Sequence, residues 1–431
     1  MATLTVKPAR KLMGRVEVPG DKSMSHRAVL FAAMAEGKSR IRHFLYGGDC
    51  EASLKAIQAI GVQVERPRQD EIIVHGRGPH AWREPEDVID CVNSGTTMRL
   101  LVGLLGAQPF TSVLTGSAQL RRRPMARVTV PLRRMGALVL GREDGKYAPL
   151  ALRGGNLQGI SYELPVASAQ VKSALILAGL FAQGETEVLE PGPARDHTER
   201  MLISMGADIH TRDGTIRVNP LTHPLSPLDM VVPGDFSSAA FLIVAALLVE
   251  QGDVWIQGVG VNPTRTGLLD VLSAMGARVE LENVRESGGE PVADIHVRSS
   301  VLQATEVRGH TVVRMIDEFP IFAVAATQAE GTTIVRDASE LRVKETDRIS
   351  AVVQELRRLG ANIEALPDGF VVHGPSSLRG ARVWSHGDHR LAMALSIAGL
   401  IAEGETVVEG AECIGDSFPS FVRLLHTLRQ E

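Results

Sequence analysis

Aromatic side chains are scarce in this chain of 431 residues, of which they make up 4%. Because proteins that hold single-stranded nucleic acid stack its bases on aromatic rings, this shortage argues against such a role. The formal net charge of -4 at pH 7 gives no overall attraction to nucleic acid, so any basic site must be local. The three cysteines, Cys50, Cys91 and Cys413, are isolated, which argues against a disulfide framework or a cysteine-rich metal site.

Long apolar runs are also missing. Even the run at 239–249 is too short to span a membrane, and the first ten residues carry neither an apolar signal core nor an Arg- and Ser-rich transit segment. We therefore expect a cytoplasmic protein. The remaining composition, with 44% hydrophobic and 22% charged residues, is typical of a globular protein, and the length predicts two or three domains.

Several well-known catalytic motifs are absent from the sequence. It has no Walker phosphate loop, no Gly-x-Gly-x-x-Gly dinucleotide turn and no Gly-x-Ser-x-Gly nucleophile elbow. His386 and His389 are spaced as two metal ligands could be, but no third ligand motif such as His-Glu-x-x-His accompanies them. We therefore predict no metal site.

What the chain does contain is an internal repeat. Val18-Pro19-Gly20-Asp21 recurs at 232–235, and each copy leads into an apolar, Ala-rich helix. Similar helices recur about every 70 residues and open near Asp21, Asn93, Ser168, Asp235, Asp317 and Asp388. A second series of amphipathic helices ends at glycines that suit a C-terminal cap, namely Gly61, Gly136, Gly206, Gly276 and Gly360, each followed by a β-type stretch.

The repeated unit is predicted to be strand, helix, strand, helix and a strand pair, which makes the protein α/β with six βαβαββ units. The sixth unit lacks its strand pair, while the N-terminus has a spare pair at 3–6 and 15–18. If these strands complete the sixth unit, one domain comprises residues 1–20 plus 235–431 and the other residues 21–234. The chain then crosses between domains only twice, which predicts a hinge and a ligand cleft between domains. Stability alone is the other use such a repeat can have.

Basic residues concentrate at or just before the predicted helix starts. In the run from Gly20 to Arg27, Lys22 and Ser23 fall in the first helical turn, and Arg27 lies one turn further on the face of Ser23. The free N–H groups and the dipole of a helix start attract an anion, so the run predicts a phosphate or carboxylate site. An ordinary capped helix with solvated charges is the alternative. Further cations of this kind are Arg121, Arg122, Arg123, Arg195, Lys344, Arg348 and Arg390.

Uncharged helix caps and two acids complete the set of candidates. Gly95 in Asn-Ser-Gly-Thr would let a ligand approach the backbone, although helix capping alone explains that segment equally well. Asp317 caps a helix, and Glu345 lies between Lys344 and Arg348. Among these cations each acid is expected to stay ionised, and a bound anion would raise its proton affinity enough for acid–base work. Local salt bridges are the alternative for both acids.

Seven segments together resemble the 5-enolpyruvylshikimate-3-phosphate synthases: 20–27, 93–99, 122–125, 168–173, 317–320, 344–348 and 387–390. Ser-Ala-Gln at 168–170 and Arg195 make the resemblance closest to the bacterial class II branch. It implies two similar domains of three βαβαββ units each, an inside-out α/β barrel, joined by two crossovers and closing over substrate. It also implies transfer of the enolpyruvyl group of phosphoenolpyruvate to the 5-hydroxyl of shikimate 3-phosphate, with release of phosphate.

The resemblance implies that no metal or organic cofactor takes part in the reaction. The expected partners are the two small-molecule substrates, with no nucleic acid and no membrane, and we expect a monomer. The pathway implied is the shikimate pathway, which leads to chorismate and the aromatic amino acids.

The resemblance also implies roles for individual residues. Asp317 takes or orients the proton of the 5-hydroxyl, Glu345 protonates the methylene carbon and later deprotonates it, and Lys22 assists the departure of phosphate. The residues implied to bind shikimate 3-phosphate are Lys22, Ser23, Arg27, Ser168, Ala169, Gln170, Arg195, Asp317 and Lys344. Those implied to bind phosphoenolpyruvate are Lys22, Gly95, Arg123, Gln170, Arg348 and Arg390.

Two positions depart from the pattern of the best-known relatives. Asp416 stands where class I enzymes have a lysine that contacts phosphoenolpyruvate, so that contact is not carried over. Gly95 replaces the alanine of some herbicide-tolerant class II members, which leaves the response to glyphosate open.

Two other functions compete with this interpretation. The sister transferase that acts on uridine-diphosphate N-acetylglucosamine carries a reactive cysteine on the loop that matches 116–125, and this loop has none. A silent anion-binding protein of the same fold would be expected to lose Lys22, Asp317 or Glu345, and all three are present.

Overall fold

The computed structural model describes residues 2–429, which form two compact units. The C-terminal unit comprises the chain up to Pro19, Pro233–Arg285 and the chain from Pro291 onward, and the inserted unit comprises Gly20–Val232 and Glu286–Glu290. The sequence-based boundaries stay a prediction about domains, and they did not foresee that 286–290 groups with the inserted unit.

The inserted unit contains three four-stranded sheets, each with one parallel and two antiparallel pairings. The first sheet runs in the order β14 (Asp229–Val231), β3 (Glu36–Arg42), β5 (Glu71–Arg77), β4 (Gln63–Arg68). The second is β6 (Ile89–Asp90), β7 (Ser112–Thr115), β9 (Tyr147–Arg153), β8 (Leu138–Gly141). The third is β10 (Ser161–Glu163), β11 (Thr186–Leu189), β13 (Thr215–Val218), β12 (Ile209–Arg212).

Each of these sheets belongs to a unit with two main helices. The first helices are α1 (Lys22–Met34), α3 (Gly95–Leu105) and α6 (Ala169–Gly179), and the second are α2 (Gly48–Ala59), α4 (Ala126–Arg134) and α7 (His197–Ser204). Short helical segments occur at α5 (Arg142–Gly145), η1 (Pro79–Ala81) and η2 (Leu120–Arg122).

The C-terminal unit repeats this plan with two four-stranded sheets and one three-stranded sheet. Their orders are β16 (Arg278–Ser287), β17 (Glu290–Arg298), β15 (Gln251–Gly260), β2 (Lys11–Glu17); β18 (Glu306–Val307), β19 (Gly331–Val335), β21 (Gly369–Gly374), β20 (Asn362–Leu366); and β1 (Thr3–Val6), β23 (Thr406–Glu409), β22 (Arg382–Trp384). The main helices are α8 (Phe236–Leu248), α9 (Gly267–Ala274), α11 (Phe319–Thr327), α12 (Arg348–Arg358), α13 (His389–Ile401) and α14 (Phe421–Leu428). Shorter ones are α10 (His310–Arg314), η3 (Ser339–Val343) and η4 (Ala411–Asp416).

The two N-terminal strands separate, contrary to the expectation that both complete the sixth unit. β1 does so, because it pairs antiparallel with β23. β2 instead lies parallel to β15 in the sheet of the fourth unit. The reason is that the strands before α1 and α8 exchange places. β14 precedes α8 in the chain but pairs with β3, the strand that follows α1. β2 precedes α1 but pairs with β15, the strand that follows α8. This exchange occurs where the chain passes through its two Val-Pro-Gly-Asp segments.

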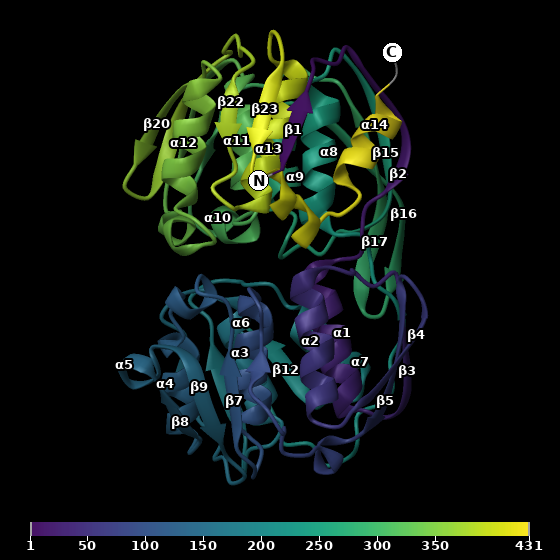
Figure 1. Cartoon of the computed structure of the whole chain (residues 1–431), viewed down its shortest axis with the longest axis vertical. Helices are drawn as coiled ribbons and strands as arrows, with labels where there is room; N and C mark the ends of the chain where they lie inside the picture. The colour runs from purple at the N-terminus through teal and green to yellow at the C-terminus, as the bar shows by residue number, and fades with distance from the viewer. Residues whose placement is uncertain (1, 430–431) are drawn as a thin grey trace. The chain divides into compact units, whose positions relative to one another are not determined.

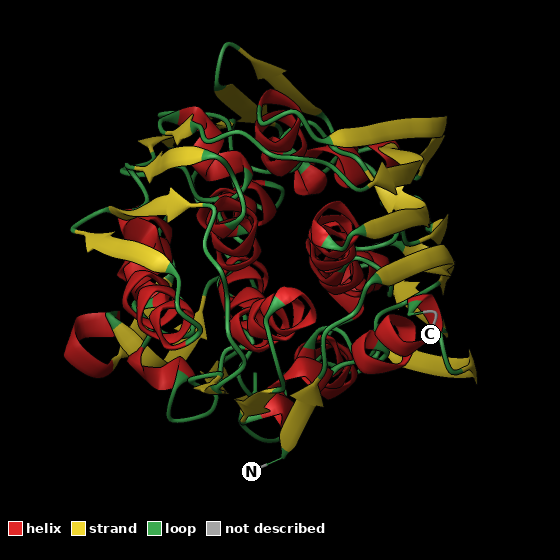
Figure 2. Cartoon of the chain, turned by 90° about the horizontal axis from the view of Figure 1, so that it is seen from above, coloured by secondary structure: helices red, strands yellow, loops and turns green. Residues whose placement is uncertain are grey.

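The first helix of each repeated βαβαββ unit is apolar on nearly every face, as a helix in the middle of a protein must be. In the C-terminal unit α8, α11 and α13 contact one another, as Figure 1 shows, and almost all of their side chains are buried. In the inserted unit α3 packs closely on α6, where a Cβ on Gly103 would lie 2.3 Å from the carbonyl oxygen of Ala174. Figure 2 shows the helices of the chain in red and its strands in yellow.

The three central helices of each of the two compact units begin at polar residues, as the sequence predicted. The prediction that Asp317 caps its helix is wrong, because the N-cap of α11 is Glu318, whose side chain makes no capping hydrogen bond. Asp21 accepts a hydrogen bond from the backbone N of Met24 (2.9 Å), and Asp235 and Asp388 cap α8 and α13 in the same manner. Since these helices carry mainly apolar side chains along their length, most of their polar residues lie near the starts, with exceptions such as Ser396 in α13. The helix starts therefore hold the candidate chemistry.

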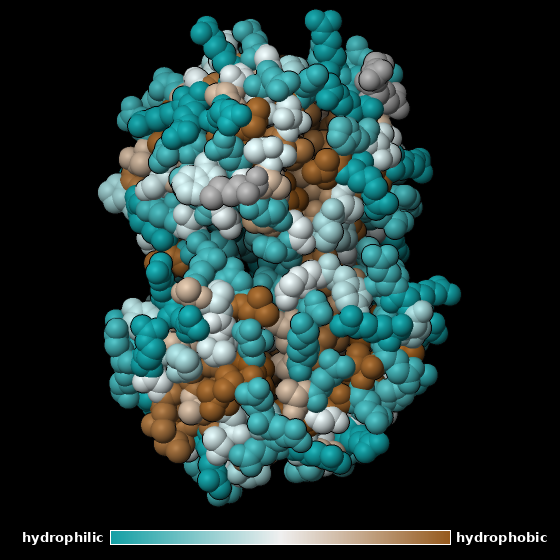
Figure 3. All heavy atoms as spheres, viewed as in Figure 1, coloured by the Kyte–Doolittle hydropathy of each residue, from teal (hydrophilic) through white to brown (hydrophobic). Residues whose placement is uncertain are grey.

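The face of the protein that Figure 3 shows is mainly hydrophilic. Exposed apolar side chains gather on α4 and the edge strand β8, where Val130, Leu138 and Leu140 are exposed. No helix within residues 2–429 is both long enough and apolar enough to cross a membrane.

Candidate functional site

The start of α1 places Lys22 and Arg27 as the sequence predicted. Lys22 Nζ lies 3.3 Å from Asp49 Oδ2, and both side chains are about one-fifth exposed. Arg27 is buried, and its Nη1 donates to the carbonyl oxygen of Ser23 (3.0 Å). Lys22 and Ser23 are partly exposed in the first turn, so this turn presents a cation and a hydroxyl at the positive end of the helix dipole.

Arg27 also connects α1 to two other helices. Its Nε donates to Thr198 Oγ1 of α7 (2.7 Å) and its Nη2 donates to Ser173 Oγ of α6 (2.9 Å). Burial lowers the pKa of Arg27 to about 10, although nearby Glu199 acts in the opposite direction. The guanidinium is therefore still charged at neutral pH.

The start of α3 meets two arginines and an amide. Arg99 Nη1 donates to Gln170 Oε1 in a short hydrogen bond, and Gln170 Nε2 donates to Thr96 Oγ1 (2.9 Å). A Cβ on Gly95 would lie 2.9 Å from Nη1 of both Arg99 and Arg123. Glycine thus lets both guanidinium groups lie against the first turn of the helix. Arg99 is the last residue of the segment 93–99 that carries the family resemblance, and the sequence predicted no role for it.

The remaining candidates of the inserted unit lie at the starts of α6 and α7. Ser168 and Ala169 are partly exposed, and the Ser168 side chain does not cap α6. Arg195 is also partly exposed and lies two residues before α7. Arg121 is partly exposed in η2, and Arg122 is exposed.

A buried lysine that sequence analysis missed fixes the segment before Arg195. Lys172 Nζ lies 2.7 Å from Glu199 Oε1 and 3.1 Å from Glu190 Oε1, and it donates to the carbonyl oxygen of Ala194 (3.1 Å). Burial acts to lower the pKa of Lys172, but the two glutamates outweigh it and raise that pKa. A lysine inside an apolar helix was the available signal, because a buried lysine needs an acidic partner.

A second missed group, centred on His26, lies behind Lys22. His26 Nδ1 is 2.8 Å from Ser53 Oγ and 3.3 Å from Thr97 Oγ1, which connects α1, α2 and α3. Burial lowers the pKa of His26 to about 3, although Asp49 acts to raise it. His26 is therefore neutral at physiological pH and connects the three helices through hydrogen bonds.

The C-terminal unit has a buried arginine at the centre of its cluster. Arg348 Nε donates to Asp388 Oδ2 (2.7 Å), its Nη2 donates to Glu345 Oε2 (2.7 Å), and its Nη1 lies 3.4 Å from Asp317 Oδ1. Burial acts to lower the pKa of Arg348, but Asp388, Glu345 and Asp317 outweigh it and raise that pKa. Burial likewise acts to raise the pKa of Asp388, and the charge of Arg348 lowers it overall.

Asp317 lies among three cations, which favours a charged carboxylate there. In addition to Arg348, Lys344 Nζ lies 3.8 Å from Oδ1 and Arg390 Nη2 lies 3.7 Å from Oδ2. The next residue, Glu318, is buried and accepts a short hydrogen bond from Ser237 Oγ. The starts of α8, α11, α12 and α13 thus meet in one group of acids and cations.

Other residues singled out from the sequence lie outside the groups around Arg27 and Arg348 or make other contacts. His386 Nε2 is 2.9 Å from Glu355 Oε1, and its ring stacks on Trp384. Asp416 ends η4 and is exposed. Within residues 2–429, the one group of side chains close enough to hold a metal ion is Glu280, Glu282 and His296, on β16 and β17.

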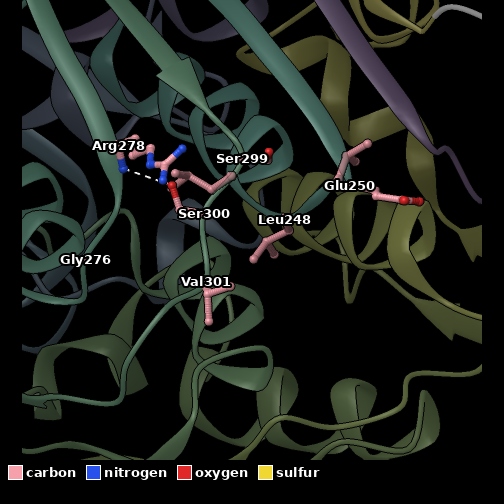
Figure 4. Close-up of a pocket in the computed structure, with 9 residues that line it drawn as sticks. Leu248, Glu250, Gly276, Arg278, Ser299, Ser300 and Val301 are labelled. Atoms are coloured by element: carbon pink, nitrogen blue, oxygen red, sulfur yellow. Dashed lines mark hydrogen bonds between the residues drawn. The ribbon is translucent and has the colours of Figure 1, made fainter.

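A surface pocket of about 430 Å³ occurs in the C-terminal unit, away from the cluster around Arg348 (Figure 4). It is lined by the end of α8, from Leu247, and by Ser299–Val301, with the backbone N of Arg278 donating to Ser300 Oγ (2.9 Å). At 1.5 Å per residue, Ser237 and Leu248 are separated by about 16 Å along α8. The pocket therefore does not belong to the cluster.

The structure thus brings the predicted residues together in two groups. We call Lys22, Ser23, Arg27, Gly95, Arg123, Ser168, Ala169, Gln170 and Arg195 the inserted-unit cluster, together with Arg99. The C-terminal cluster comprises Asp317, Lys344, Glu345, Arg348, Asp388 and Arg390.

The six repeated units, with first strands exchanged and apolar helices inside, form the enolpyruvyl transferase fold. The solved enolpyruvyl transferase NikO from Streptomyces tendae shares this fold, with a TM-score of 0.80 and 20% identity over 99% of this chain and 97% of that one. A solved EPSP synthase from Acinetobacter baumannii is more similar, with a TM-score of 0.90 and 44% identity over 99% of this chain and 98% of that chain.

Sequence comparison narrows the class to one family. The family model of EPSP synthase, 3-phosphoshikimate 1-carboxyvinyltransferase, matches residues 6–425. The 3-phosphoshikimate 1-carboxyvinyltransferase of Desulforudis audaxviator is 54% identical over 429 residues, with about 100% of each chain covered. That of Geobacter sp. strain M21 is 54% identical over 99% of both. The chain belongs to the EPSP synthase family.

The predicted family, fold and reaction are therefore confirmed. The competing prediction, a transferase that acts on uridine-diphosphate N-acetylglucosamine, is wrong. The enzyme transfers the enolpyruvyl group of phosphoenolpyruvate to shikimate 3-phosphate, a step of aromatic amino acid biosynthesis.

Proposed function

We propose that the two clusters divide the work of this reaction. The inserted-unit cluster binds the anionic groups of the substrates together with the cations of the C-terminal cluster, and the carboxylates of the C-terminal cluster move the protons. The observation that supports this most is the difference in partners. Arg27 is hydrogen-bonded to hydroxyls and a carbonyl oxygen, whereas Arg348 is surrounded by three carboxylates.

Shikimate 3-phosphate carries a phosphate and a carboxylate, which suits a set of helix starts with added cations. In this proposal it is bound by Lys22, Ser23, Arg27, Ser168, Ala169, Gln170 and Arg195, with Asp317 and Lys344 at its reacting side. The planar guanidinium groups supply paired donors to an anion, and the hydroxyls of Ser23 and Ser168 supply single ones. The partial exposure of Ser23, Ser168 and Arg195 fits direct contact with a ligand.

Phosphoenolpyruvate carries the same two kinds of group on a smaller body. We assign its binding to Lys22, Gly95, Arg123, Gln170, Arg348 and Arg390. The absence of a side chain at Gly95 keeps its backbone N–H and the nearby guanidinium groups open to a small anion. We assign Gln170 to both substrates, and its amide is held in place because it donates to Thr96 and accepts from Arg99.

The chemistry consists of an addition followed by an elimination. The 5-hydroxyl oxygen bonds to C2 of phosphoenolpyruvate while its proton passes to Asp317, and Glu345 donates a proton to the methylene carbon. In the second step the bond from C2 to the phosphate oxygen breaks, Glu345 takes back a proton from the methyl carbon, and the proton held by Asp317 passes to the departing phosphate. Lys22 stabilises the departing phosphate. The carboxylates also balance positive charge that develops at C2.

Asp317 and Glu345 share Arg348, and this arrangement suits proton transfer. Arg348 Nη2 donates to Glu345 Oε2 and Nη1 lies near Asp317 Oδ1, so one rigid group orients both acids. Asp388, buried behind it, fixes the guanidinium through Nε. We further propose that the protein works in the cytoplasm as a monomer, as expected from the sequence, without nucleic acid or membrane partners.

The proposal is tested by measuring phosphate release with both substrates in Lys22→Met and Glu345→Gln. Removing an acid–base group or a charge that stabilises the leaving group is expected to lower kcat by about 100-fold or more. Matched controls are Lys55→Met and Glu364→Gln, which alter exposed side chains and should retain wild-type turnover. Correctly folded Lys22 and Glu345 variants with more than half of the wild-type kcat would contradict the assignment.

A further inference from the structure

The tip of the β16–β17 hairpin belongs to the inserted unit, although its strands belong to a sheet of the C-terminal unit. This tip comprises residues 286–290. Glu290, its last residue, is 1% exposed. A buried glutamate at the end of an exposed hairpin requires a polar partner, because a charge removed from water is otherwise costly.

The partner of Glu290 is the first residue of α7. Glu290 Oε1 lies 2.7 Å from His197 Nδ1, and both side chains are almost fully buried. A second contact joins the tip to the same helix, since Arg200 Nη1 lies 3.4 Å from the carbonyl oxygen of Gly289. Arg200 Nε also donates to Asp196 Oδ2 at the N-terminal end of α7 (2.8 Å).

The residues on either side of His197 belong to the inserted-unit cluster or contact it. Arg195 lies two residues before it, and Thr198, directly after it, accepts the hydrogen bond from Arg27 Nε (2.7 Å). Thr198 Oγ1 is also 2.6 Å from Ser173 Oγ. Any displacement of His197 therefore moves Arg195, which lies just before α7, and Thr198, whose hydroxyl accepts the hydrogen bond from Arg27.

We infer that Glu290 is a positioning residue for shikimate 3-phosphate, which acts by holding the start of α7 through His197. The inference rests on the proposed binding roles of Arg27 and Arg195. Lys172 fixes the segment before Arg195 through Ala194, and Glu290 fixes the segment after it. A hairpin tip far along the chain thus completes the support of this binding segment.

Hydrogen bonding and charge have opposite consequences at this position, which makes the inference testable. The charge of Glu290 acts on Arg27 across the cluster. Removing a negative charge near an anion site strengthens anion binding, whereas removing the acceptor for His197 lets the start of α7 shift and weakens it. Glu290→Ala removes both, and Glu290→Gln removes only the charge and keeps an oxygen acceptor.

The experiment measures kcat, both KM values and the calorimetric Kd for shikimate 3-phosphate. For Glu290→Ala we expect the KM and Kd for shikimate 3-phosphate to rise about tenfold, as for the loss of one buried charge-assisted hydrogen bond. The kcat and the KM for phosphoenolpyruvate should change less than twofold. Glu290→Gln should restore the wild-type KM or lower it. Glu286→Gln, at an exposed position on the same tip, is the matched control.

Two comparisons keep the test decisive. A folded Glu290→Ala with unchanged shikimate 3-phosphate binding overturns the inference, as does a Glu290→Gln that is as impaired as Glu290→Ala. If Glu290→Ala does not fold, His197→Gln must show the same selective rise in KM. Arg195→Ala is measured in parallel. If its KM for shikimate 3-phosphate is unchanged, the proposed binding role of Arg195 is wrong. If its KM is raised while Glu290→Ala binds shikimate 3-phosphate normally, only the inference about Glu290 is wrong.

Discussion

Arg27 and Arg348 are both buried arginines at the centre of a cluster of helix starts, yet their surroundings are opposite. Arg27, in the inserted unit, donates to two hydroxyls and a carbonyl oxygen, and burial lowers its pKa to about 10. Arg348, in the C-terminal unit, contacts three carboxylates, whose charges raise its pKa despite burial. The hydrogen bonds of Arg27 thus go to neutral groups, and Glu199, Asp21 and Glu290 act on it as nearby charges, whereas Arg348 contacts carboxylates directly.

The difference shows how one repeated unit serves two chemical purposes. The start of a helix has backbone N–H groups that lack intrahelical partners, and the helix dipole is positive there, so each repeated unit offers a weak anion site by default. In the inserted unit hydroxyls, an amide and arginines strengthen that property. In the C-terminal unit Asp317, Glu345 and Asp388 reverse it, so the same arrangement of helices holds carboxylates in fixed positions. Binding and proton transfer can thus be tested separately.

The largest expected effect is that of Asp317→Asn on kcat. The amide keeps the shape of the side chain but cannot accept the proton of the 5-hydroxyl, so kcat should fall by about 10²- to 10⁴-fold. The KM values for both substrates should stay within about threefold of the wild type. Phosphate release under saturating substrates provides the measurement, with Glu364→Gln as an exposed control in the same unit. A raised KM with normal kcat would break the comparison, because Asp317 would then act in binding.

The next effect concerns the stability of the two arginine clusters. Arg348→Met leaves Asp388 buried without its ion-pair partner, which should lower the free energy of unfolding by about 3–5 kcal/mol. Arg27→Met removes hydrogen bonds to uncharged groups and should cost less, about 1–3 kcal/mol. Urea denaturation of the two variants compares these values directly. Equal losses would show that the carboxylates around Arg348 do not distinguish the clusters energetically.

A smaller effect follows from the histidine behind Lys22. An unfolded histidine has a pKa near 6.5, whereas burial lowers the pKa of His26 in the folded protein to about 3. Between these values the unfolded state binds the additional proton, so stability is lost as the pH falls below 6.5. From pH 7.5 to 5.5 the loss from this residue should be about 1.4 kcal/mol.

Urea denaturation at the two pH values measures this loss. His26→Asn should lack this part of the pH dependence, and His80→Asn, which alters an exposed histidine, should retain it. If His26→Asn and the wild type lose equal stability over this range, His26 is protonated in the folded protein, and the prediction of a neutral His26 is wrong.

Much of this arrangement could be predicted from residues close together in the sequence. The caps at Asp21, Asp235 and Asp388 each lie directly before an apolar helix, and the ion pair of Glu345 with Arg348 joins residues three apart. Local signals of this kind are decided within one or two helical turns.

What could not be predicted depends on pairing between distant segments. Strand β2 carries nothing that distinguishes a place beside β15 from one beside β23, because an alternating pattern gives a face and not a partner. Likewise, Glu290 and His197 are 93 positions apart, and neither is unusual in its local sequence. Lys172 was visible as a lysine in an apolar helix, but its partners Glu190 and Glu199 become evident only once α6 and α7 are packed.

The smallest effect tests the inserted-unit cluster at the backbone. In Gly95→Ala the new Cβ would lie 2.9 Å from Nη1 of Arg99 and of Arg123, so both guanidinium groups must shift by a few tenths of an ångström. Because these are the ends of flexible side chains, folding should be almost unaffected. The KM for phosphoenolpyruvate should rise several-fold, or about 1 kcal/mol, while the KM for shikimate 3-phosphate changes little.

Steady-state kinetics with each substrate varied in turn separates the two KM values. Gly399→Ala is the steric contrast, since its Cβ would lie 2.9 Å from the Thr406 side chain, inside the C-terminal unit and outside both clusters. That change should lower stability and leave both KM values near the wild type. If Gly95→Ala instead raises the KM for shikimate 3-phosphate as much as that for phosphoenolpyruvate, the start of α3 serves both anions. The inserted-unit cluster would then be a single shared site, without separate positions for the two substrates.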